Sequence, residues 1–201
     1  MNLKRKIIFY CLAVVLLPLI FFLTSCTRCS PDEEMHFRVN EELLGLAYAD
    51  SLLAIEMHIP RDWIDITEDI RMMVEENFKG SEDIYEQGLI FKKGYGDLQE
   101  VVFMLIFDFE YRRIDFDKDR AILTFFSDFS ETTEVFKQGT YTHNEIRYFQ
   151  LTSREKDMIN IKILGYGNEE RVFAIDYYIP EIKYKDYIET IESSIGSISR
   201  I

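Results

Sequence analysis

Cysteine, proline and tryptophan are scarce in this 201-residue chain, which has three cysteines, four prolines and one tryptophan. Cys11 lies in an apolar run near the N-terminus, and Cys26 and Cys29 follow it closely. The sequence after residue 29 therefore contains no cysteine. This absence excludes an internal disulfide, a cysteine-based metal site and a thiol nucleophile from the rest of the chain.

Basic residues are also few: 23 lysines and arginines stand against 36 aspartates and glutamates, a net charge of −13. The acidic residues are spread along the chain and form no single block, which is typical of a solvated surface. An excess of negative charge disfavours nucleic acid and anionic lipid headgroups as partners. A basic protein, a cation or a neutral ligand suits such a surface better.

Sequence motifs that carry catalytic chemistry are missing. The three histidines, His36, His58 and His143, do not have the spacing of zinc ligands. The chain has neither the Gly-x-Ser-x-Gly turn of serine hydrolases nor the Gly-x-x-x-x-Gly-Lys loop that holds phosphates. The sequence therefore predicts no catalytic residue and no organic cofactor, and it favours a protein that is not an enzyme.

The N-terminus has the organisation of a secretory signal. A basic start at residues 4–6 precedes an apolar run at residues 7–23, and the run ends in Leu23-Thr24-Ser25-Cys26. This ending resembles the lipobox of bacterial lipoprotein signals. The resemblance implies a signal peptide over residues 1–25, cleavage before Cys26, and a diacylglyceryl anchor on the Cys26 thiol with acyl chains such as palmitate.

Two other interpretations of this segment stay open. A run of about 17 apolar residues is at the lower limit for a transmembrane helix, and Ser25 is small enough for ordinary signal peptidase. A spanning helix does not need a Leu-Thr-Ser-Cys ending, so we favour the lipoprotein. The residue after the cysteine is Thr27 and not aspartate. By resemblance to the sorting rule of enteric bacteria, Thr27 favours the outer membrane over the inner one, with the leaflet undecided.

Removal of the signal leaves two regions. Residues 26–41 are polar, include Pro31 and an acidic triplet at residues 32–34, and are predicted to form an acidic tether. Residues 42–201 have the length of one ordinary domain. Cleavage of the signal removes three basic residues and no acidic one. The remaining chain has 20 lysines and arginines against 36 aspartates and glutamates, a net charge of −16.

Apolar periodicity in residues 42–201 predicts the elements of that domain. A hairpin is expected over residues 43–59, followed by a helix that begins at Thr67 and stops at Gly80. Residues 184–198 carry isoleucines and tyrosines three or four positions apart, which is the pattern of a second helix. Further strands are expected at residues 88–92, 101–109, 121–126, 133–137, 145–151, 158–164 and 171–179.

The connections between these strands are mostly short, which favours an antiparallel sheet. Tight turns are expected at Gly94-Tyr95-Gly96-Asp97 and at Gly165-Tyr166-Gly167-Asn168. The strand at residues 101–109 is apolar on both faces, as in a strand that is covered on both sides. The predicted class is α+β: an antiparallel sheet of about six to eight strands, packed by a helix from the N-terminal half and a C-terminal helix.

Two segments resemble the PsbP-like family of small extracytoplasmic domains. Residues 55–63, Ile-Glu-Met-His-Ile-Pro-Arg-Asp-Trp, are similar to its opening strand, which runs into a proline and a tryptophan. Residues 175–180 and the small residues within 193–198 are similar to its last strand and closing helix. The resemblance implies an antiparallel sheet sandwiched by helices, mostly accessory or assembly roles, and no shared catalytic residues.

Aromatic residues are the one excess, with 16 phenylalanines and 12 tyrosines. Tyrosine suits recognition surfaces because its ring is amphipathic. We therefore expect contacts with a partner at Trp63, Tyr166, Tyr177 and Tyr178. The alternative interpretation is that the tyrosines cap the faces and edges of the sheet.

Three alternating aspartates, Asp115, Asp117 and Asp119, could gather around Ca²⁺ in a turn. Their spacing resembles the start of an EF-hand loop, but Arg120 stands where the glycine of that loop belongs and Phe126 where its glutamate belongs. A solvated turn between two strands is the alternative interpretation. Ca²⁺ is the one metal cofactor that the sequence suggests.

Taken together, the sequence favours a lipid-anchored protein of the bacterial cell envelope that binds or assembles an envelope protein partner without catalysis. The alternative is a lipoprotein that binds a small ligand in an apolar pocket between sheet and helix, or Ca²⁺ at the turn around Asp115. A third hypothesis is an enzyme that uses carboxylates. It requires a cleft with two carboxylates whose pKa values are shifted in opposite directions.

Overall fold

The computed structural model describes four stretches of the chain: residues 33–77, 89–109, 133–166 and 171–201. These stretches belong to one compact unit from Asp32 to Ile201. Cys26, the predicted strand at residues 121–126 and the aspartates of the predicted Ca²⁺ site, Asp115, Asp117 and Asp119, lie outside the described residues. Within the four stretches, no helix has the length and apolar character needed to span a bilayer.

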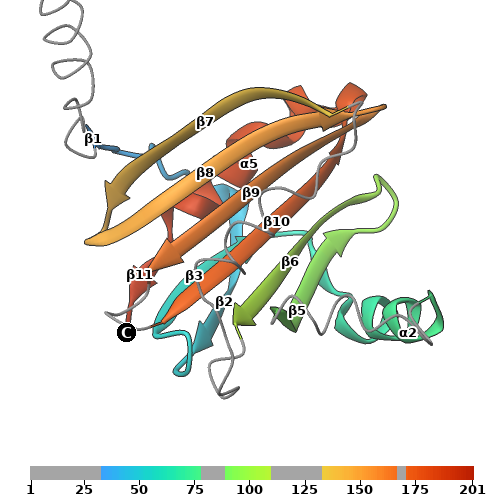
Figure 1. Cartoon of the computed structure of the whole chain (residues 1–201), viewed down its shortest axis with the longest axis horizontal. Helices are drawn as coiled ribbons and strands as arrows, with labels where there is room; N and C mark the ends of the chain where they lie inside the picture. Colours follow the sequence, from blue (N-terminus) through green and yellow to red (C-terminus); the bar gives the residue numbers. More distant parts are fainter. Residues whose placement is uncertain (1–32, 78–88, 110–132, 167–170) are drawn as a thin grey trace, which may run out of the picture. The chain divides into compact units, whose positions relative to one another are not determined.

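Most of the described strands form one large sheet (Figure 1). Its eight strands lie in the order β1 (Glu33–Glu34), β7 (Glu134–His143), β8 (Ile146–Glu155), β9 (Met158–Tyr166), β10 (Val172–Pro180), β6 (Val102–Phe109), β5 (Leu89–Asp97) and β4 (Ile64–Asp65). A small sheet has the order β11 (Ser199–Arg200), β3 (Ile55–Pro60) and β2 (Leu44–Asp50). Every described strand pair is antiparallel except β1 with β7, which is parallel.

The described helices are α2 (Thr67–Asn77), α5 (Tyr184–Gly196) and the 3-10 helices η1 (Glu41–Leu43) and η2 (Glu181–Lys183). α5 contacts β2, β3 and β10, so it covers the same face of the large sheet as the small sheet does. α2 contacts β5, close to the β4 edge of the large sheet (Figure 1). The predicted α+β class, with its antiparallel sheet and two helices, is confirmed; the small sheet was not expected.

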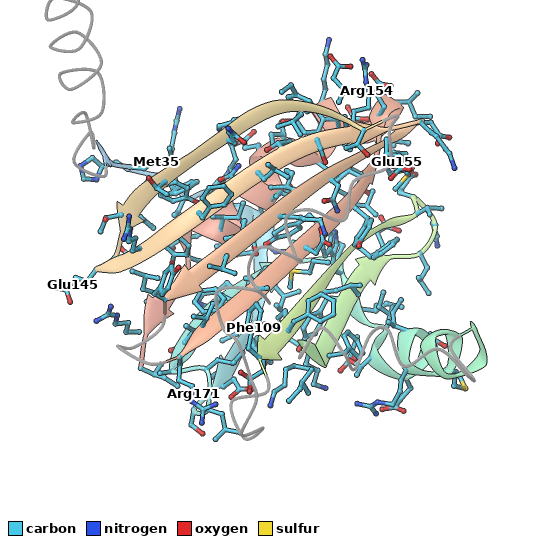
Figure 2. All side chains as sticks on the ribbon, in the orientation of Figure 1. Met35, Phe109, Glu145, Arg154, Glu155 and Arg171 are labelled. Carbon is cyan, nitrogen blue, oxygen red and sulfur yellow. The ribbon has the colours of Figure 1, made fainter. Side chains whose placement is uncertain are left out.

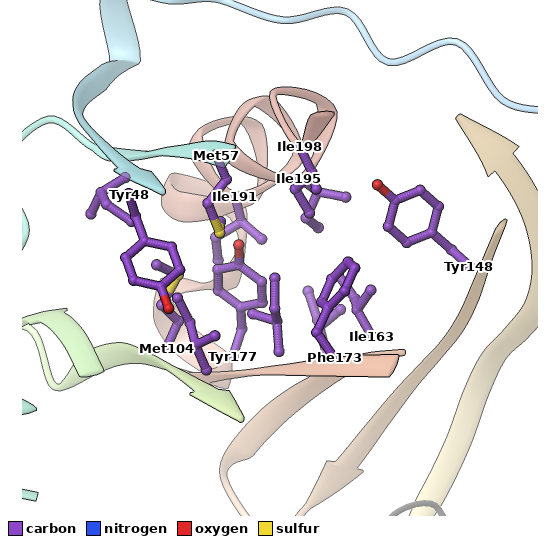
Figure 3. Close-up of a cluster of buried hydrophobic side chains, with 14 of the residues drawn as sticks. Tyr48, Met57, Met104, Tyr148, Ile163, Phe173, Tyr177, Ile191, Ile195 and Ile198 are labelled. Atoms are coloured by element: carbon purple, nitrogen blue, oxygen red, sulfur yellow. The ribbon is translucent and has the colours of Figure 1, made fainter. Parts of the chain in front are cut away.

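Side chains from both sheets and α5 form one hydrophobic core (Figure 3). Every second residue of β6, β8, β9 and β10 points into it, as strand geometry requires. The core includes Tyr48, Met57, Met104, Tyr148, Ile163, Phe173, Tyr177, Ile191, Ile195 and Ile198. Complete burial of one side chain of this size stabilises a fold by about 1.5–3 kcal/mol.

The opposite face of the large sheet is also apolar. A second buried cluster lies there, formed by Phe109, Leu164, Val172 and Ala174, with Phe107, Phe149 and Tyr166 packed against it. In β10, six consecutive residues, Val172–Tyr177, are buried. A strand that is buried on both faces has a nearly continuous apolar sequence, which explains why this strand could be predicted from the sequence.

Small residues near the end of α5 allow this helix to lie close to β3. The Ser194 hydroxyl donates to the carbonyl oxygen of His58 at 2.7 Å, and the Ser197 hydroxyl accepts from the His58 N–H at 2.8 Å. After the helix ends, Ser199 of β11 pairs with Glu56 of β3. These contacts join the C-terminus of the chain to the hairpin that precedes Trp63.

The N-terminal residues of the described chain pack on the domain and do not form a free tether. β1 pairs with Tyr141 and the residue after it in β7, and the Phe37 ring centre lies 5.7 Å from that of Tyr141. The Asn40 N–H donates to the Ser193 hydroxyl at 3.1 Å. The tether predicted over residues 26–41 is therefore too long, because the apolar side chains of this segment pack against the core.

His143 joins this N-terminal segment to α5. One ring nitrogen, Nδ1, lies 2.9 Å from the carbonyl oxygen of Met35, and the other, Nε2, lies 2.8 Å from that of Gly196, the last residue of the helix. The Phe37 ring packs edge-on against the imidazole, with 4.9 Å between the ring centres. A carbonyl oxygen can only accept, so the imidazole donates at each contact where its nitrogen carries a proton.

The turn predicted at Gly94-Tyr95-Gly96-Asp97 is wrong, because these residues lie inside β5. The turn falls at residues 98–101 instead. Gly96 is needed for close contact between strands, since a Cβ atom there would lie 2.7 Å from the Cβ of Phe103. Of the other predicted turn, Gly165 and Tyr166 belong to β9, and its remaining residues lie outside the described ones.

Asp65 organises the start of α2. Its carboxylate accepts from the Thr67 N–H at 2.9 Å and pairs with the Lys93 ammonium at 2.9 Å. Hydrogen bonding with Thr67 is the largest cause that lowers the pKa of Asp65 from 3.8 to about 2; burial opposes it, and Lys93 adds to it. Charged Asp65 therefore stabilises the folded state, and the contribution is lost on acidification.

Asp65→Asn is expected to reduce the loss of stability in acid. The stabilisation from charged Asp65 is complete above about pH 4 and disappears as the pH falls towards 2. Because the side chain is 48% exposed, solvent screening limits it to about 0.5–1 kcal/mol. Urea unfolding at pH 2, 3, 4 and 7 measures the difference, with the exposed Asp62→Asn as a control for charge. An equal acid dependence of Asp65→Asn and wild type would contradict this role.

Gly196→Ala is expected to destabilise the domain by about 1–3 kcal/mol, the usual effect of overpacking. A Cβ atom at residue 196 would lie 2.5 Å from the Cβ of Phe37 and 2.9 Å from Cγ2 of Val39. Alanine is the better helix former, so any loss of stability reports the clash. Gly139→Ala is the control, because nothing lies within 4 Å of a Cβ atom there. Equal urea midpoints for the two variants would show that the N-terminal segment is not packed on α5.

Candidate functional site

A cavity of about 170 Å³ lies between the N-terminal segment, β8, β9 and α5. Its lining consists of Met35, His36, Phe37, Arg38, Lys137, Gln150, Thr152, Ile161, Tyr184, Ile188, Glu192 and Ile195. Figure 2 shows Met35 on the N-terminal segment, beside β7 and β8. An engineered cavity of about 150 Å³ holds benzene, so this one has room for a group of similar size.

Two buried polar side chains form part of the cavity wall. Gln150 and Thr152 of β8 are only 9% and 2% exposed. The Tyr141 hydroxyl donates to Oε1 of Gln150 at 3.1 Å, and Nε2 of Gln150 lies 3.5 Å from Oγ1 of Thr152, the outer limit of a hydrogen bond. The amide has two N–H groups, and the Thr152 hydroxyl is the single acceptor recorded for them among the described residues.

Charged side chains surround the cavity where it meets solvent. Arg38 and Lys137 are exposed and positive, Glu192 is exposed and negative, and the imidazole of His36 lies beside them. The formal charge of this rim is positive, although the chain as a whole has a net charge of −13. An anionic group is therefore attracted to this point of a surface that repels it elsewhere.

β7 forms an exposed edge next to the cavity. Its first seven residues, Glu134–Thr140, are all exposed, including Val135 at 42% and Phe136 at 50%. Within the described residues, β1 pairs with β7 at Tyr141 and the residue after it, and no further. An uncovered edge presents backbone N–H and C=O groups that can pair with another strand. Lys137 belongs both to this edge and to the cavity rim, so the two features adjoin.

A buried aspartate lies on the other face of the large sheet. Asp176 accepts from the Tyr178 hydroxyl at 2.9 Å and from the Asn160 amide, and it lies 3.4 Å from the Lys162 ammonium. Burial raises the pKa of the Asp176 carboxyl, whereas Lys162 and the hydrogen bonds act in the opposite direction. These partners satisfy the carboxylate as a buried charge requires, which indicates a structural role.

Asp50 and Asp108 have pKa values shifted in opposite directions. At Asp50, burial raises the pKa, but hydrogen bonds from Leu53 and the residue before it outweigh this, and the net shift is downward. At Asp108, burial raises the pKa, and the hydrogen bond from the Phe109 N–H and the nearby Arg171 only partly offset the rise. Neither aspartate lines the cavity. Asp50 and Asp108 thus have the opposite pKa shifts that the hypothesis of a carboxylate enzyme requires. They do not line the cavity, however, which is where a substrate would have to bind.

The structure corrects the expectation of partner contacts at Trp63 and Tyr177. Trp63 is 8% exposed and Tyr177 is fully buried, and their ring centres lie 6.3 Å apart within the core. The Tyr177 hydroxyl donates to that of Ser194 at 3.5 Å. Both rings belong to the buried core cluster, so a partner cannot reach them on the surface of the folded domain.

Tyr166 and Tyr178 are half-buried on the opposite face of the large sheet. Tyr178 stacks on Phe103, with 4.8 Å between the ring centres, and Tyr166 packs against the buried cluster around Phe109. The four predicted contact residues are thus divided between two faces and form no single surface. Among the described residues, no group of three or more histidine, cysteine, aspartate or glutamate side chains could hold a metal ion.

Sequence reasoning missed Gln150 and Thr152. The signal was present, because two polar residues continue the alternation of Ile146 and Tyr148 on the core face of β8. The absence of catalytic motifs in the sequence has one exception that was overlooked, a Ser-x-x-Lys spacing from Ser153 to Lys156, of the kind found in some serine hydrolases. In the structure Ser153 is buried in β8 and Lys156 lies in the following turn. Residues three apart share a face on a helix but not on a strand.

Comparisons with known proteins bear on the fold. No protein-family model matches the chain, and no curated protein matches it. The solution structure of cyanobacterial PsbP (CyanoP) from Synechocystis sp. PCC 6803 is similar, with a TM-score of 0.50 and 14% sequence identity, and the match covers 78% of this chain and 92% of that one. The fold is PsbP-like. The resemblance expected from the hairpin and the closing helix is therefore confirmed for the fold. A sequence identity of 14% supports no conclusion beyond the fold.

Proposed function

We propose that this chain is a lipid-anchored binding module of the bacterial cell envelope that works without catalysis. The basic start, the apolar run and the Leu-Thr-Ser-Cys ending support an anchor at Cys26, and Thr27 favours the outer membrane. The PsbP-like fold agrees with the accessory or assembly roles that the family resemblance implies. The partner is another protein of the envelope.

The exposed edge of β7 carries this proposal. Backbone groups along Glu134–Thr140 can pair with an extended segment of a partner, and the exposed Val135 and Phe136 add apolar contacts. A bulge between Val135 and Lys137 and the charge of Lys137 disfavour indiscriminate pairing. An edge of this kind suits a partner segment that matches its bulge and its charges.

The tether also places this edge near the membrane. The sequence has six residues between Cys26 and Glu33 of β1, which is the neighbour of β7. The seven Cα-to-Cα steps from Cys26 to Glu33 span at most about 25 Å when fully extended. A lipid on Cys26 therefore keeps Glu33, and with it the Tyr141 end of β7, within that reach of the bilayer surface, where membrane-bound partners are concentrated.

A photoreactive side chain at residue 136 is expected to crosslink to a second protein in native membranes. Ile182 is the control position. Its side chain is 87% exposed, but it belongs to the 3-10 helix η2 and not to a strand edge. Denaturing gels and mass spectrometry identify the products. Crosslinking at residue 182 but not at 136, or monomer alone at both positions, would contradict partner binding at β7.

Cys26→Ser is expected to abolish lipid attachment and leave the leader uncleaved, because the thiol is the acceptor of the diacylglyceryl group. Two acyl chains form a stable anchor, whereas one is marginal. Metabolic labelling with an alkyne analogue of palmitate and gel mobility measure both changes. Cys29→Ser, three residues away, is the matched control and should retain both label and size. Wild-type size and label in Cys26→Ser would contradict lipidation at this position.

Binding of a small ligand is a second candidate function, and the cavity between α5 and the large sheet favours it. It agrees with the apolar pocket between sheet and helix that the sequence suggested. Cation binding at Asp115, Asp117 and Asp119 stays a separate proposal that calorimetric titration with Ca²⁺ can test; the absence of heat would end it.

A further inference from the structure

The cavity has a wall of mixed character, with apolar side chains along one part of it. Ile161 and Ile195 are buried in its wall, and Phe37 and Ile188 are half-buried there. With a volume of about 170 Å³, it has room for a compact body of about the size of benzene. The aliphatic and aromatic part of the wall suits the apolar part of a ligand, and the polar part of the wall suits a polar group on the same ligand.

The polar part of the wall presents hydrogen-bond donors. The Gln150 amide and the Thr152 hydroxyl belong to residues of the lining that are only 9% and 2% exposed. Their mutual contact, at 3.5 Å, is long. A ligand oxygen placed here would accept a shorter hydrogen bond in place of this long contact, so a ligand with at least one acceptor oxygen suits the wall.

The rim selects the charge of the ligand. Arg38 and Lys137 lie on two different segments at the same cavity, and Glu192 of α5 is the single carboxylate in the lining. The chain repels anions over most of its acidic surface, so two cationic side chains at one small cavity attract them locally. A carboxylate is a small anionic group that supplies acceptor oxygens and can be attached to a small apolar body.

We propose that the cavity binds a small monocarboxylic acid, with its apolar body between α5 and β9 and its oxygens on the Gln150–Thr152 wall and the Arg38–Lys137 rim. This inference rests on the second candidate function above and is independent of partner binding at β7. It names a chemical class of ligand that the acidic composition of the chain did not suggest.

Three probes of nearly equal shape test the charge selection: benzoate, benzamide and benzamidinium. They are titrated by calorimetry into the full chain in detergent. Benzoate is expected to bind, benzamide to bind more weakly and benzamidinium not to bind. Equal binding of benzoate and benzamide would overturn the selection of an anion and leave the ligand-binding function in place. Binding of none of the three would overturn the inference, and the crosslinking at residue 136 still tests the partner-binding function by itself.

Charge variants locate the binding. Arg38→Glu and Lys137→Glu are each expected to weaken benzoate binding about five-fold, the effect of a partly exposed ion pair, and Glu192→Gln to strengthen it by a similar factor because it removes repulsion. Arg61→Glu is the control, since Arg61 is exposed and does not line the cavity. An equal effect of Arg61→Glu would show that net charge, and not the cavity, attracts the probe.

A variant with a filled cavity distinguishes binding of benzoate in the cavity from partition of benzoate into the detergent. Ile188→Phe enlarges a half-buried side chain of the lining, and it is expected to abolish benzoate binding while the thermal midpoint stays the same or rises, as for other cavity-filling changes. Thr152→Val, of similar shape, removes the hydroxyl and is expected to weaken binding. Benzoate heats that persist in Ile188→Phe would overturn the assignment to this cavity.

Discussion

The burial of β10 on both faces is the constraint on which the rest of this structure depends. Six consecutive residues of this strand are buried, so each face of the large sheet must be covered. α5 and the small sheet cover one face. α5 can approach closely because serines near its end hydrogen-bond the backbone of β3. The β1–β7 end of the same face needs a further cover, which the N-terminal segment supplies with Phe37.

The cavity forms because two separate segments, α5 and the N-terminal segment, cover this face of the large sheet. α5 and the N-terminal segment meet above β8, where the core face changes from apolar residues to Gln150 and Thr152. Two polar side chains are buried there beside a space that neither cover fills. The same arrangement places Arg38 and Lys137 at the opening, because one follows β1 and the other lies on the exposed edge of β7. The cavity and the exposed edge of β7 therefore lie together at the β1–β7 end of the large sheet.

Much of the fold could be predicted from the sequence, because strands with two buried faces and a helix with one apolar stripe leave strong periodic signals. The hairpin, both helices and the central strands were predicted on that basis. Two errors have physical reasons. Glycines at positions 94 and 96 suggested a turn, but a neighbouring strand approaches closely there. The polar residues 33–41 suggested a tether, but their few apolar side chains pack on the core. Four aromatic residues were predicted to lie on a contact surface, but two of them, Trp63 and Tyr177, are buried in the core.

The sequence by itself determined the class of the domain, the order of its main elements, its acidic charge and the signal that predicts an anchor at Cys26. These properties follow from local composition and from periods of two and about 3.6 residues, which need no knowledge of neighbours. Only the tertiary structure decided which polar residues face a cavity, which strand edge of the described sheet is exposed and which charges meet there. Strand periodicity states that Gln150 and Thr152 share a face, but what lies opposite that face depends on residues 35–38 and 184–195, which are distant in the chain.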